Sequence, residues 1–108
     1  MKNSYIIKKH EEFNNIINNG KRIKGNILTL YYHPSIDEKK YFGFAVGKKN
    51  GNAVQRNFIK RRLRMLINTH QNLFSKKYKY IIMIRGESLD IPFNKWNDDL
   101  VQLIGKVK

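Results

Sequence analysis

The sequence contains no cysteine and only two prolines among its 108 residues. The absence of cysteine excludes disulfide bonds, thiol nucleophiles and cysteine-based zinc sites, and it fits a reducing compartment. The longest apolar run, residues 81–84, is far shorter than the roughly 20 residues of a membrane-spanning helix. The apolar patch near the amino end is too short for a secretory signal. We therefore expect a soluble, cytoplasmic protein that forms a single domain over residues 1–108.

Acidic residues are also scarce, with 8 Asp and Glu against 22 Lys and Arg, so the formal net charge is +14. No acid occurs between Lys39 and Gly86, a stretch that is rich in Lys and Arg. Hydrophobic residues make up 41% of the chain, which is enough for a folded core and argues against disorder. A small folded body with this charge is expected to bind a polyanion, either nucleic acid or an anionic membrane surface.

Hydrophobic periodicity predicts an α+β fold with helices and strands in mixed order. Short apolar and β-branched runs predict strands, and apolar residues at helical spacing predict helices. The predicted helices cover residues 10–18, 54–71 and 94–107, and the predicted strands cover 27–32, 41–46 and 78–85. The turn at 34–37 suggests that the first two strands form an antiparallel hairpin. A further strand between residues 21 and 32 is left open.

The helix that begins near Val54 has one basic face and one apolar face. At about 100° per residue, its cations and one amide fall within an arc of roughly 140°, and three apolar residues cluster elsewhere. The polar arc contains Arg56, Asn57, Lys60, Arg61 and Arg64, and the apolar cluster contains Ile59, Leu63 and Leu66. Guanidinium groups match phosphate oxygens, and an amide can bind a base edge or a ribose hydroxyl. This face therefore predicts binding to RNA or DNA.

No pattern in the sequence predicts catalytic residues or a protein-held metal ion. The three histidines, at positions 10, 33 and 70, show no metal-ligand spacing. The acidic pairs at 11–12 and 98–99 are adjacent in helices, so their carboxylates diverge and suit neither acid and base catalysis nor a two-metal clamp. A glycine-rich phosphate loop is absent as well, and no organic cofactor is expected.

Residues 47–64, GKKNGNAVQRNFIKRRLR, resemble the signature of the protein subunit of bacterial ribonuclease P. In that family a lysine pair and a Gly-x-Ala-Val turn lead into Arg-Asn-x-x-Lys-Arg-x-x-Arg on a helix. Phe13 with Ile17, the turn at 20–22, the strand around Tyr31 and the apolar strand at 80–85 also match in order and spacing. The resemblance covers roughly residues 5–105.

The resemblance implies a two-layer α-β-β-β-α-β-α sandwich, like the second domain of a small-subunit ribosomal protein, with a left-handed crossover between two parallel strands. It also implies a ribonucleoprotein that removes the 5′ leader of precursor tRNA. The resemblance further implies that the catalytic RNA subunit carries out phosphodiester hydrolysis, with Mg²⁺ that it mainly holds itself. The implied partners are this RNA subunit and precursor tRNA, with no obligate protein partner and no membrane.

The family also suggests which residues bind each RNA. Contacts to the RNA subunit are implied for Lys48, Lys49, Arg56, Asn57, Lys60, Arg61 and Arg64. The single-stranded leader would bind between the first helix and the sheet, at Phe13, Ile17 and Tyr31. Because side chains alternate along a strand, either Tyr31 or Tyr32 should face away from the core, and the family indicates that Tyr31 does.

Three positions depart from the family pattern. Phe58 stands where members usually carry a second arginine, so it is not included among the expected RNA contacts. Asn50 replaces a branched apolar residue, and Ile17 replaces a second aromatic residue of the first helix.

Two other function classes remain: a non-enzymatic RNA-binding module such as a ribosomal protein, and a double-stranded DNA binder, which would need a helix free to enter a major groove.

Overall fold

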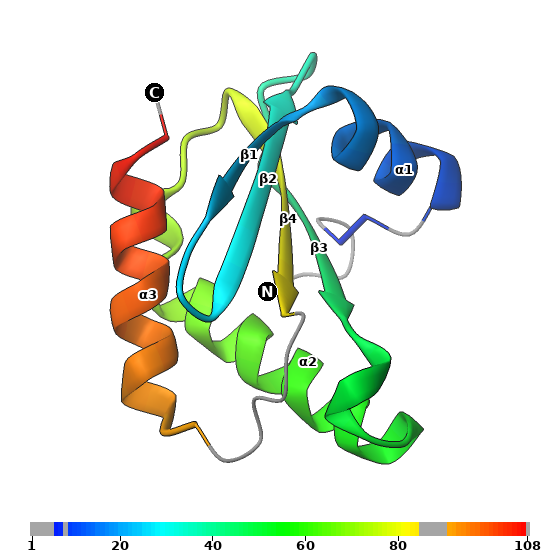
Figure 1. Ribbon diagram of the computed structural model, residues 1–108. Helices are drawn as coiled ribbons and strands as arrows, with labels where there is room; N and C mark the ends of the chain where they lie inside the picture. The colour runs from blue at the N-terminus through cyan, green and yellow to red at the C-terminus, as the bar shows by residue number, and fades with distance from the viewer. Residues whose placement is uncertain (1–5, 8, 85–90, 108) are drawn as a thin grey trace.

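The computed structural model describes residues 6–7, 9–84 and 91–107, which form three helices and four strands (Figure 1). In chain order the elements are α1 His10–Asn19, β1 Lys21–Lys24, β2 Leu28–Pro34, β3 Tyr41–Val46, α2 Ala53–Thr69, β4 Tyr78–Ile84 and α3 Phe93–Gly105. Two single 3₁₀ turns, η2 Lys48–Asn50 and η3 Gln71–Leu73, flank α2. The order α-β-β-β-α-β-α confirms the expected α+β fold. The strand left open between residues 21 and 32 is β1. No helix in the described ranges is long and apolar enough to cross a membrane.

The four strands form one mixed sheet in the order β1-β2-β4-β3. β2 is antiparallel to both β1 and β4, whereas β3 is parallel to β4. The predicted hairpin between the strands at 27–32 and 41–46 is therefore wrong, because β4 lies between them. The physical reason is that β4 is apolar on both faces, so it is most stable in the centre of the sheet with a paired strand on each side.

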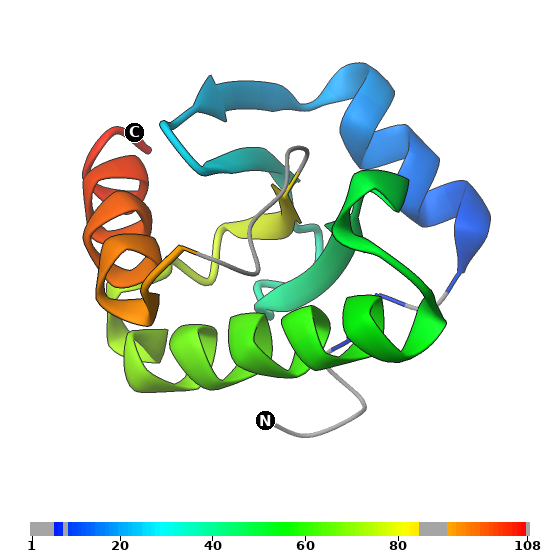
Figure 2. The same cartoon turned by 60° about the horizontal axis from the view of Figure 1, so that its bottom comes forward.

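The parallel strands β3 and β4 are joined by α2, which crosses one face of the sheet. α2 lies behind the strands in Figure 1 and comes to the front in Figure 2, and the chain returns from β3 to β4 in the left-handed sense. Crossovers between parallel strands are right-handed as a general rule, so the rule alone would have predicted the opposite hand. The left-handed crossover was expected only from the family resemblance. The crossover places the start of α2 beyond the end of β3, where η2 leads into it.

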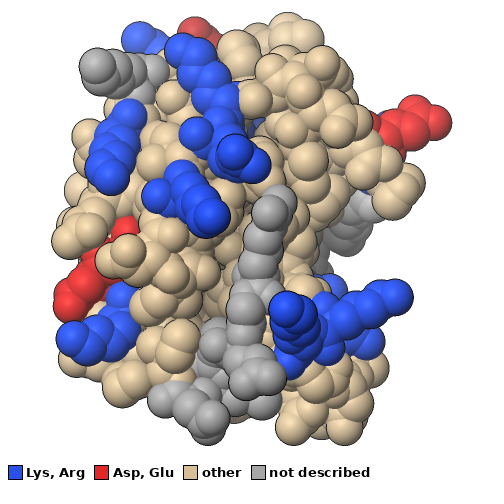
Figure 3. All heavy atoms as spheres, in the orientation of Figure 1, with Lys and Arg blue, Asp and Glu red and all other residues tan. Residues whose placement is uncertain are grey.

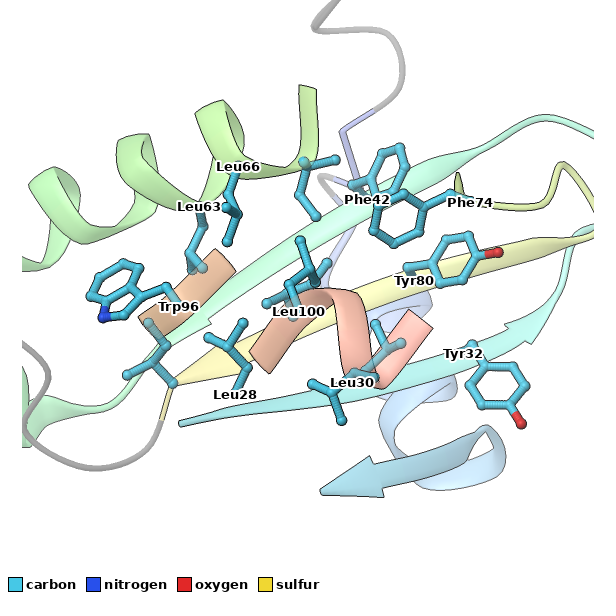
Figure 4. Packing of buried hydrophobic residues seen from close by; sticks show 14 of the residues in the cluster. Leu28, Leu30, Tyr32, Phe42, Leu63, Leu66, Phe74, Tyr80, Trp96 and Leu100 are labelled. Carbon is cyan, nitrogen blue, oxygen red and sulfur yellow. The ribbon is translucent and has the colours of Figure 1, made fainter. Parts of the chain in front are cut away.

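Helices cover both faces of the sheet. The larger cluster of buried residues joins α2 and α3 to one face, on which Leu28, Leu30 and Tyr80 alternate with residues of the other face. Figure 4 shows Leu63 of α2 and Leu100 of α3 pointing into this layer. The smaller cluster, Ile7, Ile16, Tyr31 and Ile81, lies beneath α1 on the opposite face. The sheet thus packs against α2 and α3 on one face, and α1 covers the other face.

The turn between β1 and β2 is fixed to α3 by a buried carboxylate. Asp99 accepts hydrogen bonds from the backbone N–H groups of Asn26, Ile27 and Leu28, at 3.0, 3.0 and 2.7 Å. A Cβ atom on Gly25 would lie 2.5 Å from the same carboxylate, so only glycine leaves room for this approach. Asp99, which the sequence showed only as half of an acidic pair, is therefore a structural hydrogen-bond acceptor for the turn at the edge of the sheet.

Candidate nucleic-acid interface

The loop before α2 places two lysines at the start of the helix. Lys48 and Lys49 are exposed on η2, while Asn50 is buried and donates its side-chain amide to the Gly47 carbonyl at 3.2 Å. A branched apolar residue could not make this bond, so the departure at Asn50 is accommodated by a polar contact. Gly51 then turns the chain with φ of 100°, a conformation that side chains rarely adopt.

The amino end of α2 is closed by a capping box between Asn52 and Gln55. The backbone N–H of Gln55 donates to Asn52 Oδ1 at 3.0 Å, and the N–H of Asn52 donates to Gln55 Oε1 at 2.9 Å. These bonds satisfy backbone donors that would otherwise lack partners and define where the helix begins. No acid occupies the first turn, so the positive end of the helix dipole adds to the charge of the preceding lysines.

The predicted division of α2 into a core face and a basic face is confirmed. Ile59, Leu63, Leu66 and Ile67 are buried against the sheet. Asn57, Arg61 and Arg64 are exposed, and Arg56 and Lys60 are half-buried at the margin of the helix. Figure 3 shows Lys and Arg side chains gathered near the end of β3 and the start of α2, with a second group over β1. All seven residues expected to contact the RNA subunit thus lie on η2 and α2, in one continuous segment.

The guanidinium group of Arg62 lies against aromatic rings. Its central carbon lies 4.6 Å from the ring centroid of Phe58, and 5.8 Å from those of Phe93 and Trp96. Cations at such distances are attracted to the negative faces of aromatic rings. Phe58 itself is partly exposed on α2. The residue that departs from the family pattern therefore positions a neighbouring arginine.

The residues expected to contact the leader lie on the other face of the sheet, at α1. Phe13 and Ile17 are half-buried, one helical turn apart, beside the buried Ile16. The ring of Phe13 lies directly on β3, because a Cβ atom on Gly43 would be 3.1 Å from Phe13 Cε2. The sheet thus separates these residues from the basic face of α2.

The expectation that Tyr31 faces away from the core is wrong. Tyr31 is 4% exposed and Tyr32 is 6% exposed, so both rings are buried. They do point to opposite faces, as alternation requires, but each face has its own helical cover: Tyr32 packs with the α2 and α3 cluster, and Tyr31 packs under α1. Tyr31 is buried because α1 packs closely on this second face of the sheet. In the free protein Tyr31 supports Phe13 and Ile17 from below.

Charged side chains also tie α1 to the sheet. Lys79 of β4 forms an ion pair with Glu12 of α1, and its ammonium group lies 5.4 Å from the ring centroid of Tyr41. Asp37 accepts a hydrogen bond from the Tyr41 hydroxyl at 2.6 Å, which lowers the pKa of this carboxyl. The ion pair joins α1 to β4, and Tyr41 at the start of β3 lies beside the same ammonium group.

A further group of lysines surrounds a hollow at the carboxyl end of α2. Lys39, Lys40 and Lys76 line it together with Glu38 and Gln71. Lys40 donates to the Gln71 carbonyl at 2.7 Å. Burial, and next the charge of Lys76, lower the pKa of Lys40. The acid-free middle of the sequence predicted basic surfaces of this kind, but the position of this one depends on the fold.

Two carboxylates of the described residues are engaged in contacts within the fold. Glu12 is paired with Lys79, and Asp99 is used by the turn between β1 and β2. Within the described residues, no group of three or more His, Asp or Glu side chains could hold a metal ion.

Sequence reasoning overlooked one feature of α2. Val54, Phe58 and Met65 are exposed apolar residues on the same helix as the cations. A helical-wheel projection places them within about 40° of one another, which is the signal that could have identified them.

Comparison with known proteins identifies the family to which this geometry belongs. A family model described as Ribonuclease P matches residues 1–108. The chain belongs to the ribonuclease P protein family. The ribonuclease P protein component of Mycoplasma mycoides subsp. mycoides is 38% identical over 109 aligned residues, covering 100% of both chains. That of Acholeplasma laidlawii is 31% identical over 108 residues, covering 100% of this chain and 93% of the relative.

Solved structures of the family share this fold. The RNase P protein of Staphylococcus aureus superimposes with a TM-score of 0.83 at 28% identity, covering 95% of this chain and 96% of that one. The RNase P protein from Thermotoga maritima gives a TM-score of 0.84 at 19% identity, covering 94% and 96%, and this likeness concerns the fold alone. Family membership makes the chain a protein component of an RNA-cleaving ribonucleoprotein that acts in tRNA processing.

Proposed function

We propose that this protein is a subunit of a cytoplasmic ribonuclease P that binds the catalytic RNA subunit and the 5′ leader of precursor tRNA. In this role it promotes endonucleolytic removal of the leader, which leaves the mature 5′ end of the tRNA. The observation that carries the proposal is the acid-free segment from Lys48 to Arg64, in which a lysine-bearing turn leads into a capped helix with an exposed basic face.

The RNA subunit is assigned to η2 and α2 for electrostatic reasons. Exposed Arg and Lys side chains without acidic neighbours release counterions when they bind phosphates, which makes binding favourable and salt-dependent. Asn57 adds an exposed amide that can donate to a ribose or base and accept from it. The core face of α2 anchors the helix, so the cations are held in a fixed register.

The leader is assigned to the α1 face of the sheet. Single-stranded RNA binds where aromatic and apolar side chains meet cations, because bases stack on rings and phosphates contact the charges. Phe13 and Ile17 supply half-buried apolar surface, with Tyr31 beneath them. Arg22 of β1 is exposed and lies opposite Tyr31 on the neighbouring strand, so it supplies charge on this face.

Catalysis is assigned to the RNA subunit and to Mg²⁺ held by its phosphates. The acids of the described residues are not grouped as metal ligands, and Glu12 and Asp99 already have cationic or amide partners. The protein's contribution is to reduce repulsion between the RNA subunit and its precursor substrate, which are both polyanions. This effect raises the affinity for precursor tRNA and for the ions that the RNA binds.

Replacement of Arg56, Lys60 and Arg64 by alanine tests the proposed RNA contact. If each contacts about one phosphate, the slope of log affinity against log salt falls by about 2, and affinity at physiological salt drops sharply. The matched control replaces Lys39, Lys76 and Lys77, which are exposed at the other end of α2 and carry the same total charge. Wild-type affinity of the Arg56, Lys60 and Arg64 variant at physiological salt would contradict the assignment. Equal losses in both variants would indicate only a general charge effect.

A further inference from the structure

The exposed side of α2 carries an apolar stripe, which consists of Val54, Phe58 and Met65. These side chains are 74%, 41% and 60% exposed. They fall within an arc of about 40° on the helical wheel, well away from the buried residues Ile59 and Leu63. Six large hydrophobic residues of the described chain are exposed, and three of them lie on this one helix face. Such a concentration marks a contact surface better than scattered exposed residues do.

Cations border the apolar stripe on both sides. Arg61 projects about 20° to one side of Val54, and Arg62 projects about 40° to the other side of Phe58. The guanidinium of Arg62 lies over the Phe58 ring at 4.6 Å, so a cation sits directly beside the exposed apolar residues. The sequence from Lys39 to Gly86 contains no acid, so nothing in this segment neutralises the border.

The charges decide which partner fits this surface. A second copy of the chain would bring two bodies of formal charge +14 together through their basic helices, which like-charge repulsion opposes. RNA offers both chemistries at once, phosphates for the border and base faces for the stripe. A regular A-form duplex presents phosphates and ribose hydroxyls but keeps its base faces stacked inside. An apolar stripe within a basic face therefore fits RNA whose bases are unpaired and turned outward.

We propose that α2 binds the RNA subunit at a segment with unpaired bases, which pack against Val54, Phe58 and Met65 while their phosphates contact Arg61 and Arg64. This inference rests on the proposed function and adds the kind of RNA structure that α2 selects. The two sets of residues have separate roles: the stripe contributes affinity that does not depend on salt, and the cations contribute affinity that does.

The test compares two triple variants of the full chain for binding to a bacterial ribonuclease P RNA over a range of salt concentrations. The stripe variant is Val54→Ser, Phe58→Ser and Met65→Gln, and the control variant is Ile36→Ser, Leu73→Ser and Val101→Ser, all exposed positions. Because each base that packs on the stripe adds to the affinity, the stripe variant should lose affinity on the order of tenfold or more. Its salt slope should stay unchanged, and the control should bind as the wild type does.

Chemical probing of the RNA supplies a second readout. Dimethyl sulfate modifies unpaired adenines and cytosines, so the wild type should protect a few of them and the stripe variant should not.

A stripe variant that binds as tightly as the wild type would overturn the inference. The inference would also be overturned if a perfect RNA duplex competed fully with the RNA subunit for the protein. A third contradicting result would be self-association of the wild type that the stripe variant loses while its affinity for the RNA subunit is unchanged. The single variant Phe58→Ser gives the same comparison if the triple variant unfolds. Wild-type protein that fails to stimulate cleavage refutes the proposed function, whereas failure of this inference leaves stimulation intact.

Discussion

Asp99 offers a prediction whose size can be worked out from the structure. Asp99→Ala removes the acceptor of three backbone N–H groups in the turn between β1 and β2. The N–H of Leu28 is buried, and a buried donor without a partner costs about 1–3 kcal/mol. The N–H groups of Asn26 and Ile27 are only partly buried, so water replaces part of their bonds, at about 0.5 kcal/mol each. The free energy of unfolding should therefore fall by about 3 kcal/mol.

Urea unfolding followed by the fluorescence of Trp96 measures this change, since Trp96 is the single tryptophan and is buried on the same helix. The control is Asp98→Ala, which removes the same charge from the adjacent exposed position and should cost less than about 0.5 kcal/mol. Gly25→Ala should act like Asp99→Ala, because its methyl group would displace the carboxylate. Equal stabilities of the Asp98→Ala and Asp99→Ala variants would refute the reasoning.

Two further predictions concern the sheet. Gly43→Ala should push the Phe13 ring away from β3, which costs about 1 kcal/mol of stability and lowers the preference for precursor over mature tRNA in binding assays. Gly105→Ala, with open space around it on α3, serves as the control and should lower neither stability nor this preference, and an unchanged preference in Gly43→Ala would count against the leader assignment. Burial raises the pKa of Tyr80 to about 12, above its ordinary value of 10.0. Its neutral phenol therefore stabilises the fold fully below pH 10, and this contribution is lost as the pH rises toward 12. Unfolding measured from pH 9 to 12 should show a smaller alkaline loss in Tyr80→Phe than in the wild type, and parallel curves would contradict this.

The helices could be predicted because their periodicity is carried by a few large side chains. Trp96, Leu100 and Leu103 are all buried on α3, as their spacing indicated, and the buried face of α2 follows the same rule. Strand order could not be predicted in this way. β4 is apolar on both faces, and such a strand pairs equally well with any neighbour until the rest of the sheet is fixed.

Long-range contacts account for the features of the site that the sequence did not indicate. Alternation correctly placed Tyr31 and Tyr32 on opposite faces, but the burial of both depends on α1 covering the second face. Asp99 reaches a turn at the other end of the chain, which no local pattern shows. The basic face of α2 was predictable because it lies on a single helix.

The most direct test of the central claim is cleavage of a precursor tRNA by a bacterial ribonuclease P RNA at low magnesium, with and without the purified protein. The account predicts that the protein restores cleavage at the mature 5′ end, because its positive charge offsets the repulsion that Mg²⁺ would otherwise screen. Unchanged cleavage, combined with salt-dependent binding to other structured RNAs, would contradict the account and indicate an RNA-binding module without a role in processing.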